Sequence, residues 1–176
     1  MVALLEDLDR RGITYCVASN GTRERIEASL RAAGLLPRFA DRLFSAEQVA
    51  HPKPAGDLFL HAARTLGAVP SECLVIEDTP PGIAAARAAR MVAWATASTC
   101  PADELLGADW ISPSVGALGA ALRDKLGSSQ LVTSPEQETG RASKRHEFPT
   151  GLRPRQPDDR YRARIRGTSK ALKGST

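Results

Sequence analysis

The feature that most constrains this sequence is the alternation of short apolar segments with stretches of helical periodicity. The apolar segments are expected to form buried strands, at Ile13–Ala18, Leu43–Ser45, Leu74–Ile76, Met91–Ala95 and Asp109–Ile111. The helical stretches are Val2–Arg11, Thr22–Gly34, Gly56–Leu66, Pro80–Ala89 and Val115–Leu126. Strands that alternate with such helices are joined by right-handed βαβ crossovers, which build a parallel sheet covered on both faces. The sequence therefore predicts an α/β fold.

The alternation stops at about Gly127, where the composition also changes. Residues 126–176 are rich in Ser, Gly, Pro, Gln, Thr and Arg, and their apolar residues are isolated. The net charge of +4 is uneven as well, because residues 127–176 hold 11 Lys and Arg against 5 Asp and Glu, whereas residues 1–126 hold 13 against 15. We therefore expect one domain over residues 1–125 and a basic, disordered tail over residues 126–176.

No segment approaches the roughly 20 apolar residues that a membrane-spanning helix needs. The residues after Met1 are acidic and charged, unlike the basic and apolar start of a signal peptide. We therefore expect a cytoplasmic protein without a membrane partner. Cys16, Cys73 and Cys100 are widely spaced and form no CxxC pair, which argues against a disulfide framework or a zinc site.

Polar residues follow the first strand at the edge where parallel sheets bind ligands. Ser19, Asn20 and Gly21 offer a hydroxyl, adjacent amides and close backbone approach, which together suit a phosphate oxygen. The simpler interpretation is that these residues cap the next helix, and taken alone they favour it.

Two adjacent carboxylates, Glu77 and Asp78, end the third strand. Such carboxylates repel each other unless a cation or hydrogen-bond donors offset their charge. Magnesium prefers oxygen ligands and would do so. Alternatively, Glu77 faces solvent and Asp78 caps the helix that begins near Pro80. The two residues by themselves do not decide between these interpretations.

Lys53 lies between two prolines in His51-Pro52-Lys53-Pro54, which restrict the backbone and hold its ammonium in a defined direction. A lysine held in this way can offset the charge of a phosphate and of carboxylates. An isolated loop lysine is more often solvated, and His51 is expected to be an ordinary loop residue.

Three segments occur in a fixed order, Cys16-Val-Ala-Ser-Asn-Gly, Lys53-Pro-Ala-Gly-Asp-Leu-Phe and Val75-Ile-Glu-Asp-Thr-Pro-Pro-Gly-Ile-Ala-Ala-Ala. In spacing and local sequence they resemble the second, third and fourth motifs of haloacid-dehalogenase-like hydrolases, especially the sugar-phosphate phosphatase and phosphoglucomutase branch. The resemblance covers about residues 1–125 and implies a partial Rossmann-like, three-layer sandwich.

The resemblance also implies a role for each polar residue named above. Ser19 and Asn20 would hold the phosphoryl group, and Lys53 would steady the phosphate and the nucleophile. Glu77 and Asp78 would bind Mg²⁺. The implied reaction is magnesium-dependent hydrolysis of a small phosphorylated metabolite. Its identity is not specified, because the helical cap that would select it precedes the second motif in this family.

The first motif of the family, a strand that ends in Asp-x-Asp-x-Thr or Val, has no counterpart in this sequence. In the family that motif supplies the nucleophile that forms an aspartyl-phosphate, so we expect this chain to be inactive alone. Asp7-Leu8-Asp9 has the required spacing, but no apolar strand precedes it and Arg10 and Arg11 replace small turn residues. We interpret Asp7 and Asp9 as solvated charges on the first helix.

Two further departures concern the fold. The missing strand would lie centrally in the family sheet, beside the strand that ends at Ser19, so apolar edges should be exposed. Arg90 stands before Met91 where the family usually has Gly, and a positive φ at this position would strain the backbone.

An alternative function comes from the basic tail. A non-catalytic protein could bind nucleic acid or an acidic partner through arginines that meet phosphates and a tyrosine that stacks on a base. These residues are Arg153, Arg155, Arg160, Arg162, Arg164, Arg166 and Tyr161. A solvated tail without a specific partner is the simpler expectation.

Overall fold

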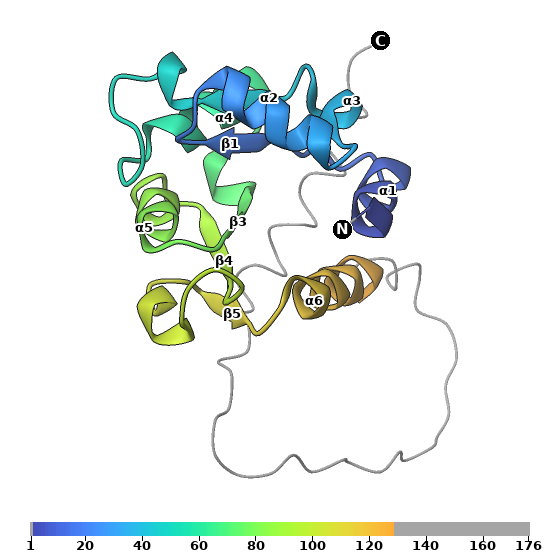
Figure 1. The fold of residues 1–176 in the computed structure, drawn as a ribbon. Helices are drawn as coiled ribbons and strands as arrows, with labels where there is room; N and C mark the ends of the chain where they lie inside the picture. Colours follow the sequence, from blue (N-terminus) through green and yellow to red (C-terminus); the bar gives the residue numbers. More distant parts are fainter. Residues whose placement is uncertain (1, 129–176) are drawn as a thin grey trace, which may run out of the picture.

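In the computed structural model, residues 2–128 form parallel strands covered by helices, and the structural description is confined to these residues (Figure 1). The expected tail therefore lies outside the described residues, apart from 126–128, which continue the last helix. Among residues 2–128, no helix has both the length and the apolar character needed to cross a membrane.

The order of elements follows the alternation expected from the sequence. The helices are α1 (Val2–Arg10), α2 (Arg23–Ala32), α3 (Leu36–Phe39), α4 (Asp57–Thr65), α5 (Pro80–Ala88) and α6 (Val115–Ser128), with 3₁₀ turns η1 (Ala46–Gln48), η2 (Pro70–Glu72) and η3 (Ala102–Leu105). The strands are β1 (Val17–Ser19), β2 (Leu43–Ser45), β3 (Leu74–Glu77), β4 (Val92–Thr96) and β5 (Trp110–Ser112). The short helix α3, which has a proline in its first turn, was not expected.

The strands form two parallel sheets, β1–β2 and β3–β4–β5. In the first, Ser19 is in register with Ser45. In the second, Glu77 is in register with Ala95 of β4. β1 starts at Val17, four residues later than expected, because only Val17–Ser19 finds a partner in β2. Among the described residues, β1 and β3 are therefore each paired along one edge only.

Both sheets nevertheless share the same two helical layers. On one face, Val17 of β1 and Leu74 of β3 pack against a cluster that includes buried residues of α1 and α6 together with Trp94 of β4. On the other face, Ala18 of β1 packs against the cluster that α4 and α5 form over β3 and β4. The two sheets thus form one interrupted layer between helices.

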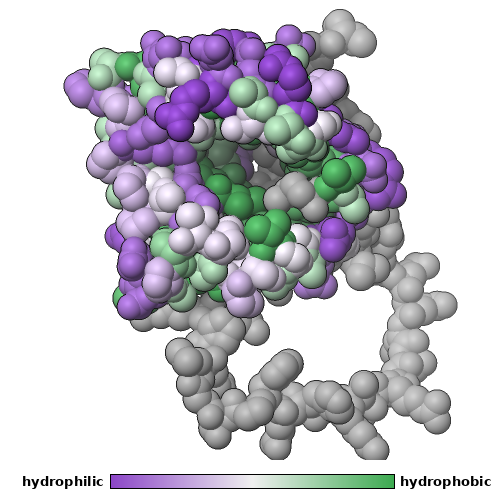
Figure 2. Space-filling view, viewed as in Figure 1, coloured by the Kyte–Doolittle hydropathy of each residue, from purple (hydrophilic) through white to green (hydrophobic). Residues whose placement is uncertain are grey.

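The interruption exposes apolar surface, as the sequence analysis predicted. Ile76, in the middle of β3, is 41% exposed, although its register partner Trp94 is 1% exposed. Figure 2 shows hydrophobic residues around a hollow between the part of the molecule that contains β1 and the part that contains β4 and β5.

Local backbone features also agree with the sequence. Thr22 caps α2 and Thr79 caps α5, each by accepting a backbone N–H through its hydroxyl oxygen. Gly34, the expected end of the second helix, has φ of +69°. Arg90 has φ of 58°, so the strain expected at this position is present.

Candidate functional site

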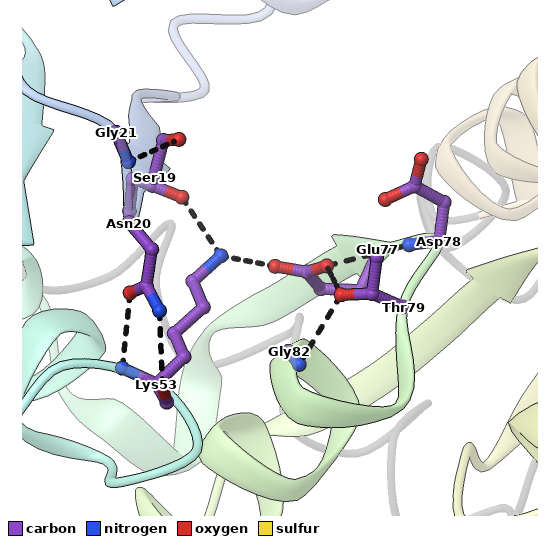
Figure 3. Close-up of polar contacts among 9 residues, drawn as sticks. Ser19, Asn20, Gly21, Lys53, Glu77, Asp78, Thr79 and Gly82 are labelled. Carbon is purple, nitrogen blue, oxygen red and sulfur yellow. Dashed lines mark hydrogen bonds and ion pairs between the residues drawn. The ribbon is translucent and has the colours of Figure 1, made fainter. Parts of the chain in front are cut away.

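The candidate site lies at the carboxyl ends of β1 and β3, where Lys53 connects the two sheets (Figure 3). The Lys53 ammonium donates to the carbonyl oxygen of Ala18 at 2.9 Å and forms an ion pair with Glu77. Both charged side chains are only 9% exposed. The ammonium also lies 4.7 Å from the ring centroid of Phe59. The alternative interpretation of Lys53 as a solvated loop lysine is therefore wrong, because its charge is balanced inside the protein.

The Glu77 carboxylate is held at the start of α5. The Thr79 hydroxyl donates to Glu77 Oε2 at 3.2 Å, and the backbone N–H of Asp78 donates to the same oxygen at 3.4 Å. A Cβ at Gly82 would lie 2.0 Å from Cδ of Glu77, so position 82 has room only for glycine. Glu77 does not face solvent, and Thr79, not Asp78, caps the helix.

In Figure 3 the Asp78 carboxylate lies apart from the Glu77 carboxylate and from the Lys53 ammonium, and no contact joins it to either group. The hydroxyl of Thr99 donates to Asp78 Oδ2, and Cys100 Sγ donates to the Asp78 carbonyl oxygen at 3.2 Å. Burial and the carboxylates of Glu104 and Asp78 raise the pKa of the Cys100 thiol. Cys100 therefore remains protonated and able to donate. The Asp78 carboxylate is partly exposed and has lone pairs to spare for a ligand.

Ser19 and Asn20 lie at the end of β1, beside Lys53. The Ser19 hydroxyl accepts the backbone N–H of Gly21 at 3.2 Å, which leaves its own proton to donate. The Asn20 side chain forms hydrogen bonds with both backbone groups of Lys53, at 2.9 and 3.0 Å. The predicted contact of Asn20 with a phosphoryl group stays a prediction.

Glu77 and Asp78 suit a magnesium ion in part. Proteins bind Mg²⁺ through one or two carboxylates together with water and substrate phosphate oxygens, and the adjacent residues Glu77 and Asp78 each supply one carboxylate. Among residues 2–128 there is no cluster of three or more His, Cys, Asp and Glu side chains that could enclose a metal ion. The residues therefore fit an open site, in which Asp78 is accessible and Glu77 is engaged by Lys53.

Other acidic residues considered from the sequence lie elsewhere. Asp7 and Asp9 are on α1, where Asp7 pairs with Arg10 and Asp9 accepts the hydroxyl of Tyr15. Both are helix charges as predicted, but only Asp9, with a 45% exposed side chain, is solvated, because the Asp7 side chain is 15% exposed.

His51 has a carboxylate partner that the sequence analysis did not find. Its Nδ1 lies 2.9 Å from Oδ2 of Asp57, at the start of α4, and its side chain is 75% exposed. The six-residue spacing gave no helical or strand periodicity from which this contact could be predicted.

Comparison with known proteins agrees with the fold and with the family that the sequence resembles. A family model for haloacid dehalogenase-like hydrolases matches residues 1–90. Hexitol phosphatase A of Escherichia coli is 37% identical over 89 residues, which are 50% of this chain and 40% of that protein. The chloroplast protein Suppressor of Quenching 1 of Arabidopsis thaliana is 43% identical over 88 residues, 50% of this chain and 8% of that protein.

A solved structure of the same family has a similar fold. The crystal structure of a hydrolase of this family from Deinococcus radiodurans, with bound phosphate and sodium, superposes with a TM-score of 0.63 at 32% identity. It covers 76% of this chain, which spans 60% of that protein. The chain belongs to the haloacid dehalogenase-like hydrolases, in the branch that includes sugar-phosphate phosphatases. It spans about half or less of the curated relatives that head the comparison.

Proposed function

We propose that this chain carries the phosphate- and magnesium-binding part of a phosphatase for small phosphate monoesters of the sugar-phosphate type. The observation that supports this most is the buried ion pair of Lys53 and Glu77, because it holds a cation beside Ser19 at the carboxyl edge of the sheet. Fixed charges at such an edge can stabilise the charge that develops on a phosphoryl group. The similarity to hexitol phosphatase A supports the substrate class.

Each residue has a proposed role. The hydroxyl of Ser19 and the backbone N–H groups that follow it donate to phosphoryl oxygens, and Lys53 offsets their charge. Asp78, with Glu77, holds Mg²⁺, which when bound neutralises negative charge on the phosphoryl group. In this proposal the partner is a small phosphorylated metabolite and the location is cytoplasmic.

The proposed reaction passes through an aspartyl-phosphate, and its nucleophile is not one of these residues. Glu77 is held by Lys53, and Asp78 points toward Thr99, so neither is placed to attack a phosphoryl group next to Ser19. We therefore propose that the chain alone binds magnesium and phosphate without hydrolysing esters.

Calorimetric titration of the purified chain with MgCl₂ and with inorganic phosphate tests binding, and release of phosphate from several sugar phosphates and p-nitrophenyl phosphate tests turnover. We expect binding without turnover, and turnover once an N-terminal segment with the Asp-x-Asp-x-Thr motif is added. Asp78→Ala should abolish magnesium binding. Asp57→Ala is the control, because Asp57 pairs with the exposed His51.

Magnesium-dependent turnover by the chain alone, lost in Asp78→Ala, would show that another group attacks the phosphoryl centre. The absence of both magnesium and phosphate binding would refute the proposed site itself. Binding of nucleic acid through the tail remains the alternative proposal. A salt-dependent binding assay with and without residues 126–176 separates it from the phosphatase.

A further inference from the structure

The side chain of Asn20 contacts the backbone of Lys53 at both of its polar groups. Asn20 Nδ2 donates to the carbonyl oxygen of Lys53 at 2.9 Å, and the Lys53 N–H donates to Asn20 Oδ1 at 3.0 Å. Asn20 follows β1 directly, whereas Lys53 lies 33 residues later in the loop before α4. One side chain thus joins two loops that come from different parts of the sequence (Figure 3).

The prolines on either side of Lys53 reduce the number of backbone hydrogen bonds that could otherwise hold this loop. Pro52 and Pro54 have no backbone N–H, so Lys53 carries the only N–H of the three residues. Asn20 accepts that N–H, and no strand or helix includes the loop. The backbone of Lys53 is therefore anchored by a side chain and not by secondary structure.

The far end of Lys53 is fixed as well. Its ammonium has three N–H donors, of which one goes to the Ala18 carbonyl oxygen and one to Glu77. One donor remains for a ligand, and its direction is set by the other two and by the position of the Lys53 backbone. Freezing a lysine side chain costs conformational entropy, and in this site much of that cost is met before a ligand arrives.

We propose that Asn20 is a positioning residue for Lys53, which orients the ammonium by clamping the Lys53 backbone. Only a side chain with both a donor and an acceptor can make the two contacts. Aspartate keeps the acceptor for the Lys53 N–H but has no donor for the carbonyl oxygen, and alanine has neither. The role of Lys53 toward phosphate rests on the proposed function, whereas the clamp itself does not.

The test is the chemical reactivity of Lys53. The full chain is treated with limiting acetic anhydride at constant pH, and acetylation is quantified by mass spectrometry for Lys53 and for Lys125, which serves as internal reference. We expect Asn20→Ala to speed acetylation of Lys53 about tenfold relative to Lys125, the factor that corresponds to about 1.4 kcal/mol. Asn20→Asp should give an intermediate rate, since one of the two contacts survives.

Two control variants give the rates of Lys53 acetylation with which this result is compared. Ser19→Ala should leave the Lys53 rate unchanged, because the Ser19 hydroxyl is bonded to Gly21 and not to Lys53. Glu77→Gln should raise the rate, because it removes the charge that pairs with the ammonium. Unchanged acetylation of Lys125 in each variant shows that the fold is retained.

A Lys53 rate that is the same in Asn20→Ala, Asn20→Asp and the parent chain would overturn the proposal. Weaker phosphate binding by Asn20→Ala with that same unchanged rate would make Asn20 a direct ligand instead. If Asn20→Ala also speeds acetylation of Lys125, the isosteric Asn20→Asp variant decides. Failure of the parent chain to bind phosphate would refute the proposed function, but the acetylation rates would still decide whether Asn20 positions Lys53.

Discussion

Glu77 carries its carboxylate into the interior of the protein, and three neighbouring residues are matched to it. Lys53 balances its charge, Thr79 donates a hydrogen bond, and Gly82 leaves the space that it occupies. A buried carboxylate is costly unless it is paired and hydrogen-bonded. The short sequence Glu-Asp-Thr-Pro-Pro-Gly is therefore explained in large part by one functional group.

We expect Gly82→Ala to destabilise the protein by about 1–3 kcal/mol, because the added methyl would overlap the Glu77 carboxylate and force it to move. Urea denaturation measures the free energy of unfolding. Gly116→Ala is the matched control, since a Cβ there meets only Ser114 Oγ at 3.8 Å. It should be neutral or stabilise α6 slightly, because alanine favours helix over glycine. Equal costs for the two variants would contradict the close packing at Gly82.

Replacing Arg90 with glycine should stabilise the protein. Its φ of 58° costs a side-chain-bearing residue roughly 1–2 kcal/mol, part of which is offset because glycine is more flexible in the unfolded state. We expect Arg90→Gly to raise the free energy of unfolding by up to about 1 kcal/mol. Gly67→Ala, at φ of +67° with no atom within 4 Å of the added Cβ, should lower it. A loss of stability in Arg90→Gly would show that the arginine side chain itself contributes more than the strain costs.

At the scale of elements, the sequence predicted helix bounds well, because they depend on residues close together in the chain. The apolar periodicity placed α2 and α5 within a few residues of their observed bounds, whereas the cap of α5 by Thr79 was not predicted. The start of β1 was misplaced because a strand is defined by its partner, and Ile13–Cys16 have none in β2.

In the candidate site, too, the positions of the residues were predicted, whereas the contacts between their side chains were not. The motifs placed Ser19, Lys53 and Glu77 at loop and strand ends, and the topology of a parallel sheet predicts that such ends lie together. The pairing of Lys53 with Glu77 and the clamp of Asn20 on Lys53 were not predictable, because they join residues 24 and 33 positions apart. The direction of a side chain across that separation depends on how two sheets sit between shared helices.

The N-terminus of α5 offers a test in which two caps are compared. Thr79 accepts Gly82 N–H and also donates to Glu77, whereas the Thr22 hydroxyl accepts Arg25 N–H and makes no such second contact within residues 2–128. Loss of a cap costs about 1 kcal/mol, and loss of a hydrogen bond to a charged group about 1.5–3 kcal/mol more. We therefore expect Thr79→Ala to lower the free energy of unfolding by more than Thr22→Ala does. A thermal melt of both variants measures the difference, and equal shifts would mean that Glu77 does not depend on Thr79.

At the scale of the whole molecule, the interrupted sheet is the dominant feature. Helical layers cover both sheets continuously, yet β1 and β3 each keep an edge without a strand partner among the described residues. Adjacent strands in a sheet lie about 4.8 Å apart, so one further strand between β1 and β3 would place them about 9.6 Å apart. Lys53 reaches both strand ends across this interruption through the Ala18 carbonyl and Glu77. The site's cation is therefore held at the gap between the two sheets by contacts to both of them.

The unpaired edge of β3 should make the chain associate with itself. Unpaired strands with exposed apolar side chains pair with other chains, and Ile76 is 41% exposed at the centre of β3. We expect Ile76→Thr to reduce concentration-dependent association in sedimentation velocity, because threonine keeps the β-branched shape and replaces apolar surface with a hydroxyl. Leu106→Thr is the control, since Leu106 is 76% exposed but lies after η3, outside the strands. If Leu106→Thr reduces association as much as Ile76→Thr does, general hydrophobicity and not the open edge of the sheet drives it. Addition of the N-terminal segment should suppress association in the parent chain to the same extent as Ile76→Thr, because a strand inserted beside β3 covers the same edge.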